Sequence, residues 1–361
     1  MKKSVCILIS LAMVFMWVAC SAGQQSETSG GNNFVEKYPE IAYGPQNGLT
    51  QSDYRFGFSF GGIAAYADPV PGMANLAADE SGIPHITVQT PQNWIQNEQN
   101  QMLDGLIASG MKGILMMPSE ATAGNQQIAK MVDAGIPVVC MGGPPELPSK
   151  TTLTLATDVY RAAYDGTVAC IKAMGEAGNL VSLSGMLNDT NTEKRLQAVR
   201  DAVAEYPDVQ LIQEIADIEN PELAMTGVGN LLAARASEID GIVATTYETA
   251  VALANYMMMD DQYVHIKAVG TDTDKKVMDA IVEGKMIGTM SQNPWAQGYV
   301  GMYTLKMLVD GWTYKDGEPE VVNSGSYLIT PAEVVGYEDF VIGETMKLME
   351  TWTERFNPPA R

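Results

Sequence analysis

Histidine, cysteine and basic side chains are scarce in this chain of 361 residues. It has two histidines and four cysteines, and 22 Lys and Arg residues stand against 43 Asp and Glu residues, for a net charge of −21. Proteins that bind nucleic acid need clustered Lys and Arg side chains to contact phosphates. The acidity therefore argues against a nucleic-acid partner and is typical of a soluble acidic surface.

The few cysteines and histidines leave little for metal or nucleophilic chemistry. Cys140 lies in a strand-like segment and Cys170 in a helix-like one, and no CxxC or Cys/His spacing of a zinc site occurs. We therefore expect two buried, unreactive thiols and no bound metal. His85 and His265 both begin strand-like segments, whereas ligands of α/β proteins bind at the opposite ends of strands, so we expect structural roles for both.

Common cofactor and catalytic motifs are also missing. The first turn after a strand-like segment reads "FGGIAAYADPVPG", which does not match the GxGxxG pattern of a dinucleotide site. No P-loop, HExxH or GxSxG motif occurs. The sequence predicts neither a cofactor nor enzymatic activity; a glycosidase, the remaining enzyme alternative, would need two opposed carboxylates.

The amino-terminal segment has the layout of a secretion signal. Lys2 and Lys3 precede an apolar run, and a wholly polar stretch follows Cys20. The run is too short for a stable membrane span. Cys20 follows the small Ala19, which resembles the lipobox of bacterial lipoproteins, so we expect a signal peptide at 1–19, lipid attachment at Cys20 and a flexible linker at 20–52. The alternative is ordinary cleavage near Ala19 or Ala22.

Beyond the linker, strand-like and helix-like segments alternate. The strand-like segments are short, apolar and bounded by Gly or Pro, as expected of strands buried on both faces. They are residues 54–60, 85–89, 113–118, 137–141, 153–157, 179–185, 209–215, 241–246, 266–272 and 287–292. Repeated βα units predict the α/β class, and this number of strands favours two doubly wound parallel-sheet lobes.

Several segments together resemble the type I periplasmic sugar-binding proteins, the ribose-binding-protein-like group. They are "GILMMPSE", "AGIPVV", "KRLQAVRDAVAEYPDVQLI", "AVGTD" and "IGTMSQNPWAQG", and their order and spacing run from about residue 53 to 330. The resemblance implies two lobes joined by a hinge of three crossings. The first lobe would hold residues 53–156 and 294–323, and the second would hold 157–293 and 324–361 with a packed terminal helix.

The same resemblance implies a function. Relatives of this kind close two lobes over one small ligand and present it to a membrane partner. We therefore expect a monomeric, extracytoplasmic lipoprotein, in the periplasm or on the cell surface, that delivers a sugar, a polyol or an amine-bearing analogue to an ABC permease. The alternative is a sensory binding protein that presents its ligand to a receptor kinase or a chemoreceptor.

Two ligand-binding positions of the family are retained. Asp272 matches the aspartate that accepts hydrogen bonds from sugar hydroxyls, and Gln292 matches the glutamine at the second crossing. For Asp272 an alternative role is to cap a helix that starts near Thr273. Aromatic and acidic side chains that follow other strands complete the expected site: Tyr66, Asp68, Trp94, Tyr247 and Trp295. For Tyr66, Asp68 and Trp94 the alternative is a role as loop or core residues.

Other family positions are changed. The Asp-Arg pair that follows the fourth strand falls on Gly142 and Gly143, where backbone or a bulkier ligand would take its place. The arginine of the sixth-strand helix falls on Glu193, which is alternatively a first-turn helix acid, and an asparagine falls on Thr246.

Arg195 matches a structural arginine of the family, so the expected site has no basic partner. This disfavours ordinary aldoses, acidic sugars and phosphates, and favours a ligand with many hydroxyl donors or an amine.

Overall fold

Five strands of the amino-terminal half and one strand from near the carboxyl end form a six-stranded parallel sheet. Its order is β12-β5-β4-β3-β1-β2. These strands are β1 (Phe56–Ser59), β2 (Thr87–Val88), β3 (Gly113–Met116), β4 (Val138–Met141), β5 (Leu153–Ala156) and β12 (Val321–Asn323). This computed structural model describes residues 41, 48–187 and 189–359. The expected signal peptide, Cys20 and most of the expected linker lie outside the described residues.

A second six-stranded sheet has the order β13-β10-β9-β8-β6-β7. It contains β6 (Gly178–Leu183), β7 (Val209–Ile215), β8 (Gly241–Ala244), β9 (Lys267–Thr271), β10 (Gly288–Gln292) and β13 (Ser326–Ile329). All pairs are parallel except β10 with β13, which is antiparallel. The expected α/β class with two parallel-sheet lobes is therefore confirmed, with one antiparallel edge strand added.

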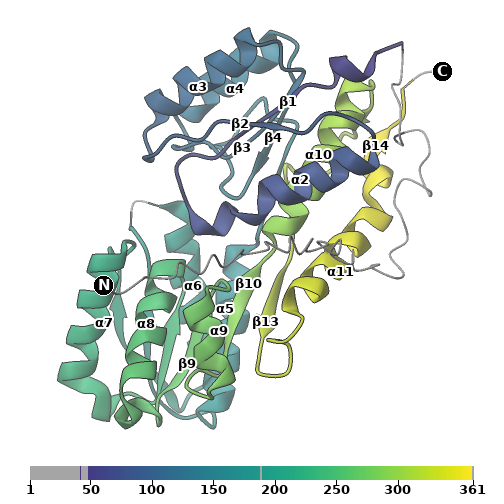
Figure 1. The fold of residues 1–361 in the computed structure, drawn as a ribbon. Coiled ribbons are helices and arrows are strands. Elements are labelled where there is room, and N and C mark those ends of the chain that lie inside the picture. The colour runs from purple at the N-terminus through teal and green to yellow at the C-terminus, as the bar shows by residue number, and fades with distance from the viewer. Residues whose placement is uncertain (1–40, 42–47, 188, 360–361) are drawn as a thin grey trace, which may run out of the picture. The chain divides into compact units, whose positions relative to one another are not determined.

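Helices cover both faces of each sheet. In the first lobe they are α2 (Pro69–Glu80), α3 (Gln96–Ala108), α4 (Gly124–Asp133) and α10 (Pro294–Val309). In the second they are α5 (Val159–Ala173), α6 (Thr190–Ala204), α7 (Pro221–Arg235), α8 (Tyr247–Met259) and α9 (Lys275–Val282). Figure 1 shows α3 and α4 on one side of the first sheet and α2 and α10 on the other.

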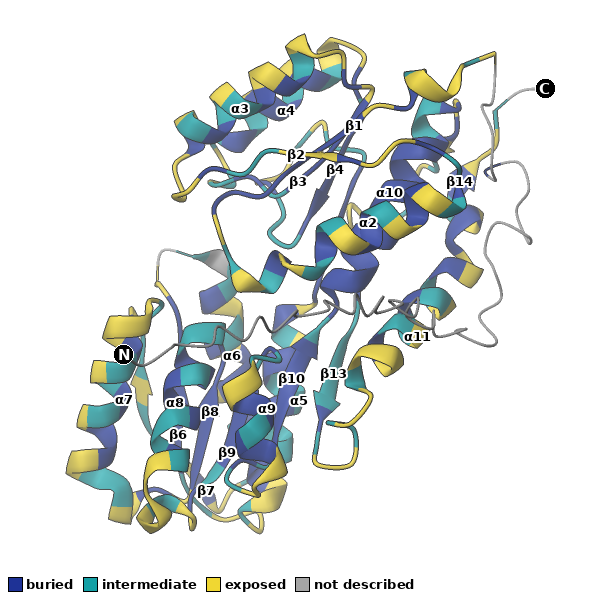
Figure 2. Cartoon of the chain, viewed as in Figure 1, coloured by how far each residue is buried: buried dark blue, intermediate teal, exposed yellow. Residues whose placement is uncertain are grey.

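Alternation along single strands explains this layering. In β3, Leu115 belongs to the core beneath α2 and α10, whereas Ile114 and Met116 belong to the core beneath α3 and α4. Successive side chains of a strand point to opposite faces, so a run of apolar residues serves two cores. Figure 2 shows buried strands in both sheets and exposed outer faces on their helices.

All ten strand-like segments contain a strand, but two edge strands are not buried on both faces: in β7 only Val209 is buried. β2 has only two residues, both exposed, at the edge of the first sheet.

The expected buried thiols are confirmed, since Cys140 and Cys170 are free and buried, and burial raises the pKa of each to about 12. Within the described ranges, no helix combines the length and apolar character needed to cross a membrane.

The chain passes between the two sheets three times. It leaves β5 for α5 through residues 157–158, leaves β10 for α10 at Asn293, and leaves β12 for β13 through residues 324–325. Pro294 opens α10 at a position where a missing backbone N–H costs nothing, and the Asn293 side chain accepts a hydrogen bond from the Ala296 N–H.

The carboxyl-terminal helix corrects one expectation. We expected residues 324–361 to belong to the second lobe, but α11 (Tyr337–Glu350) packs along α10, as Figure 1 shows. Val341, Met349 and Trp352 lie in the core of the first lobe. An antiparallel pair of strands, β11 (Thr313–Tyr314) with β14 (Phe356–Asn357), also joins the segment after α11 to the segment after α10. Its apolar stripe indicated a packed helix but did not indicate which lobe it packs on.

Candidate functional site

A cavity of about 290 Å³ lies beside the crossings and is lined by residues of both lobes. Its walls come mainly from the loops that follow β1 and β9, from the start of α10 and from the start of α11. The lining residues are Ala65, Tyr66, Asp68, Pro69, Tyr247, Asp272, Thr273, Asp274, Lys275, Ser291, Gln292, Pro294, Trp295, Tyr337 and Glu338. The predicted residues Tyr66, Asp68, Tyr247, Asp272, Gln292 and Trp295 are thus brought together.

Asp272 follows the last residue of β9 in an unusual backbone conformation. Its φ is +66°, a left-handed value that few residues other than glycine and Asn or Asp adopt. The Asp272 N–H donates to the Met290 carbonyl at 2.9 Å, and the Thr289 hydroxyl donates to the Asp272 carbonyl at 2.7 Å. Backbone bonds to β10 therefore hold this conformation, which is a feature common at functional sites.

The Asp272 carboxylate is nearly inaccessible to solvent. The residue is 9% exposed, and burial raises its pKa to about 6, against the opposing effects of the Gln292 hydrogen bond and the Arg195 charge. Gln292 Nε2 donates to Asp272 Oδ1 at 2.9 Å. A buried carboxylate of this kind is a strong acceptor for hydroxyl groups that would replace water.

The alternative capping role belongs to a different aspartate. Asp274 is the N-cap of α9, and its side chain accepts from the Lys276 N–H at 2.8 Å. The Tyr247 hydroxyl also donates to Asp274 Oδ2, at 2.7 Å. The Asp272 side chain is therefore not used for capping and lines the cavity, while the Tyr247 hydroxyl is engaged within the second lobe.

Tyr66 forms the wall contributed by the first lobe. It sits on a short 3-10 helix, Ala65–Ala67, directly before α2, and Asp68 precedes Pro69 as an exposed residue. Gln297 Nε2 donates to the Tyr66 hydroxyl, and burial raises the pKa of Tyr66 far above its usual value. Tyr66 is therefore protonated at neutral pH and presents its ring beside Asp272.

Trp94, Gly142 and Gly143 lie outside the cavity lining. The Trp94 ring packs edge-on to Phe60, with centroids 5.3 Å apart, and Phe60 in turn neighbours Tyr66 at 6.3 Å. A Cβ atom on Gly142 would lie 3.7 Å from Tyr66 Cε1 and 3.0 Å from Met117 Sδ. Gly142 therefore lies close to Tyr66, whereas Trp94, which is 44% exposed, neighbours Phe60.

Glu193 and Thr246 are also outside the lining. Glu193 is an exposed acid in the first turn of α6. Thr246 is the buried N-cap of α8, and its hydroxyl lies 3.0 Å from the Thr249 hydroxyl. An acid in the first turn and a threonine at the N-cap are both favoured at the start of a helix in general.

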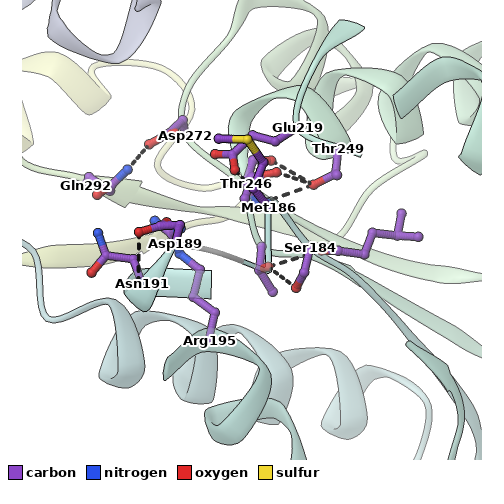
Figure 3. Close-up of polar contacts among 12 residues, drawn as sticks. Ser184, Met186, Asp189, Asn191, Arg195, Glu219, Thr246, Thr249, Asp272 and Gln292 are labelled. Atoms are coloured by element: carbon purple, nitrogen blue, oxygen red, sulfur yellow. Dashed lines mark hydrogen bonds and ion pairs between the residues drawn. The ribbon is translucent and has the colours of Figure 1, made fainter. Parts of the chain in front are cut away.

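Arg195 of α6 is a largely buried basic residue outside the cavity lining. Its side chain is 13% exposed and lies 4.0 Å from the Asp189 carboxylate (Figure 3). Its positive charge opposes the burial that raises the pKa of Asp272, and it does the same for Glu248, whose pKa burial, Glu219 and Asp272 raise to about 7. The arginine charge therefore acts on both acids from outside the lining, and the expectation of a site without a basic partner stays a prediction.

The expectation that ordinary aldoses are disfavoured stays a prediction. It depends on the missing arginines, and Arg195, whose charge acts on Asp272 and Glu248, does not line the cavity. The lining residues that the sequence analysis missed, Tyr337 and Glu338, come from α11, which packs on the other lobe than expected. Only the spatial arrangement could reveal them.

Comparison with known proteins agrees with this fold. Residues 56–313 match the periplasmic binding protein domain family. Over 256 residues, 71% of this chain and 72% of the relative, the chain is 24% identical to a xylitol-binding protein of Mycolicibacterium smegmatis. A D-apiose import binding protein of Actinobacillus succinogenes is 25% identical over 228 residues, 62% of this chain and 71% of the relative.

Solved structures of other proteins share this fold. A periplasmic solute-binding protein of an ABC transporter from Actinobacillus succinogenes, with bound D-allose, superposes with a TM-score of 0.71 at 20% identity, covering 78% of this chain and 99% of that one. A sugar-binding protein of a sugar ABC transporter from Bacillus halodurans has a TM-score of 0.71 at 21% identity, with the same coverage. This chain belongs to the periplasmic binding protein family.

Proposed function

We propose that this protein captures a sugar or polyol between its two lobes and delivers it to an ABC importer. The observation that carries the proposal is the cavity that both lobes line, with the buried Asp272 carboxylate on one side and the Tyr66 ring on the other. A ligand that contacts both walls stabilises one arrangement of the lobes, so binding becomes a shape that a permease can recognise.

The lining chemistry suits a ring or chain of hydroxyl groups. Carboxylate and amide oxygens accept hydroxyl hydrogens, and the faces of Tyr66, Trp295 and Tyr337 offer surfaces for C–H groups. The xylitol, D-apiose and D-allose named for the relatives belong to this class of compound.

The charges around the cavity disfavour an anionic ligand. Asp68, Asp272, Asp274 and Glu338 all line it. The lining cation is Lys275, whose ammonium already pairs with Asp279 at 2.7 Å. We therefore include neutral and amine-bearing polyhydroxy compounds in the proposal, and exclude sugar acids and sugar phosphates.

We also propose an extracytoplasmic monomer anchored through a lipid on Cys20. The support is the lipobox-like placement of Cys20 after Ala19 and the extracytoplasmic location of periplasmic sugar-binding proteins. Expression of the Cys20→Ala variant beside the wild type tests the anchor. The wild type should fractionate with membranes and the variant should not; equal fractionation of the two would contradict it.

Ligand capture is tested by melting the purified protein with D-allose, xylitol, D-ribose, D-glucosamine and D-galacturonate in turn. A compound that binds only the folded state raises the melting temperature. We expect a neutral compound or the amine to give the largest rise and D-galacturonate to give none. A largest rise with D-galacturonate would overturn the charge argument, and no rise with any wider set of sugars and polyols would overturn the proposed function.

A further inference from the structure

The carboxyl-terminal helix α11 lies beyond the part of the chain that matches the family. That match ends at residue 313, yet Tyr337 and Glu338, from the first turn of α11, line the cavity. We propose that this extension completes the ligand site: Tyr337 is a positioning residue that closes the hinge side of the cavity and couples its occupancy to the relative position of the lobes. This inference rests on the proposed function.

Tyr337 touches both lobes. Its ring meets the Trp295 ring of α10 edge-on, with centroids 6.2 Å apart and an interplanar angle of 85°. The Tyr337 hydroxyl donates to Glu338 Oε1 at 3.1 Å, and Thr273 of the second lobe, next to Asp272, opposes the burial that raises the pKa of Tyr337. The Tyr337 side chain also packs against the apolar cores of both lobes. It therefore joins the two principal walls of the cavity.

The remainder of α11 is fixed to the first lobe and to a crossing. The Trp352 Nε1 donates to the Thr304 hydroxyl of α10 at 3.0 Å, and Val341 and Met349 are buried in the first core. The Thr345 hydroxyl lies 3.2 Å from Oδ1 of Asn293, the residue at which the chain crosses from β10 to α10. Since these side chains are buried, α11 moves as part of the first lobe and not independently of it.

A buried polar network continues from this crossing to the cavity. The Asn293 Nδ2 donates to the Ser324 carbonyl at 2.9 Å, which joins the second crossing to the third. Gln297 Nε2 lies 3.1 Å from the Ser324 hydroxyl and also donates to the Tyr66 hydroxyl. Thus the anchor of α11, two crossings and the Tyr66 wall share one set of hydrogen bonds.

The first turn of α11 also contacts the second lobe. The Phe340 ring lies edge-on to Tyr327 of β13, with centroids 5.3 Å apart. A rotation about the crossings must therefore change the contacts of Tyr337 and Phe340 while the rest of α11 keeps its own. A ligand held between Asp272 and Trp295 lies against Tyr337, so its presence favours the arrangement in which these contacts are made.

The test compares three single variants of the full chain. Tyr337→Ala removes the ring, Tyr337→Phe keeps the ring and removes the hydroxyl, and Met346→Ala serves as a control on the same helix. Met346 packs against the first core but does not line the cavity. The probes are xylitol and D-allose, with binding measured by calorimetry, unliganded stability by thermal melting, and lobe closure by the change in radius of gyration on adding the probe.

We expect Tyr337→Ala to weaken binding at least tenfold and to reduce the contraction, and Tyr337→Phe to weaken it a few-fold. Met346→Ala should lower the melting temperature but leave the Kd within twofold. Unchanged binding in Tyr337→Ala, or equal weakening in Met346→Ala, would overturn the inference while the proposed function stands. If the wild type bound no sugar or polyol, the proposed function would fail, and this inference with it.

Discussion

The Gln292 side-chain amide donates a 2.9 Å hydrogen bond to the Asp272 carboxylate, which joins the ends of the neighbouring strands β10 and β9. Gln292 is also the last residue before the chain crosses into the first lobe at Asn293. The bond thus holds the main acceptor of the cavity directly beside the hinge. Small movements at the crossing therefore reach Asp272 through this bond, in addition to its backbone bonds with Met290 and Thr289.

Replacing Asp272 with Asn should weaken ligand binding and stabilise the unliganded protein. Asn tolerates the left-handed backbone, so the change removes the charge without added strain. Because burial raises the pKa of Asp272 from 3.8 to about 6, loss of the buried charge should raise the free energy of unfolding at pH 7 by up to about 3 kcal/mol.

Calorimetry and chemical denaturation measure the two effects of Asp272→Asn. We expect at least a tenfold loss of affinity for whichever polyol binds the wild type. Asp165→Asn is the matched control, because Asp165 pairs with Arg161 on α5 at 2.7 Å and neither residue lines the cavity. Wild-type affinity in Asp272→Asn would remove Asp272 from the site.

Ligand affinity should fall in mildly acidic solution. The pKa of Asp272 is raised, so the folded, unliganded protein takes up a proton as the pH falls through about 6, and its own stability rises relative to neutral pH. A ligand whose hydroxyls donate to the carboxylate requires the ionised form. Affinity should therefore drop about tenfold between pH 7.5 and pH 5.

The groups that face Asp272 during this titration are Arg195 of α6, Glu248 of α8 and Tyr66 of the first lobe. Calorimetry across this pH range, with Asp272→Asn in parallel, separates their effects. The variant should show a flatter profile, since Glu248 alone would still titrate. A profile that is flat in the wild type would contradict the assignment of Asp272 as acceptor.

Arg195→Met should shift this pH profile upward. The arginine charge opposes the raised pKa of both Asp272 and Glu248, so its removal raises both values further. Affinity at pH 7 should then fall several-fold and recover in part at pH 8.5. Arg200→Met, on the same helix but exposed and paired with Glu214, should leave the profile unchanged. If the two variants behaved alike, Arg195 would have no special relation to the site.

Gly142→Ala should cost stability and also impair binding. Gly142 has a φ of +67°, where an added Cβ costs about 1–2 kcal/mol. Its Cβ would press on Met117 and approach Tyr66, which lines the cavity. Gly135→Ala is the matched control, because Gly135 has a φ of +79° with no atom within 4 Å of the added Cβ. Equal affinities in the two variants would show that the Gly142 turn serves only the fold.

Local patterns in the sequence were sufficient to predict most of the fold. The strands of both sheets are short apolar segments between Gly and Pro residues, and parallel sheets need such segments because both faces are buried. The family resemblance of the segment "AVGTD", which ends β9, singled out Asp272, and the structure places Asp272 in the cavity lining. What the pattern could not decide was whether Asp272 or Asp274 caps α9, since both stand within one turn of its start.

The sequence by itself determined the two-lobed α/β class, the acidic surface and the strand ends at which we expect the site. Only the tertiary structure decided that the Arg195 charge acts on Asp272, that Trp94 packs on Phe60 outside the cavity lining, and that α11 joins the first lobe and lines the cavity with Tyr337. The physical reason is the distance along the chain over which sequence patterns carry information. Propensity and periodicity report on neighbours within a few residues, whereas Tyr337 meets Trp295 through packing of helices that are far apart along the chain.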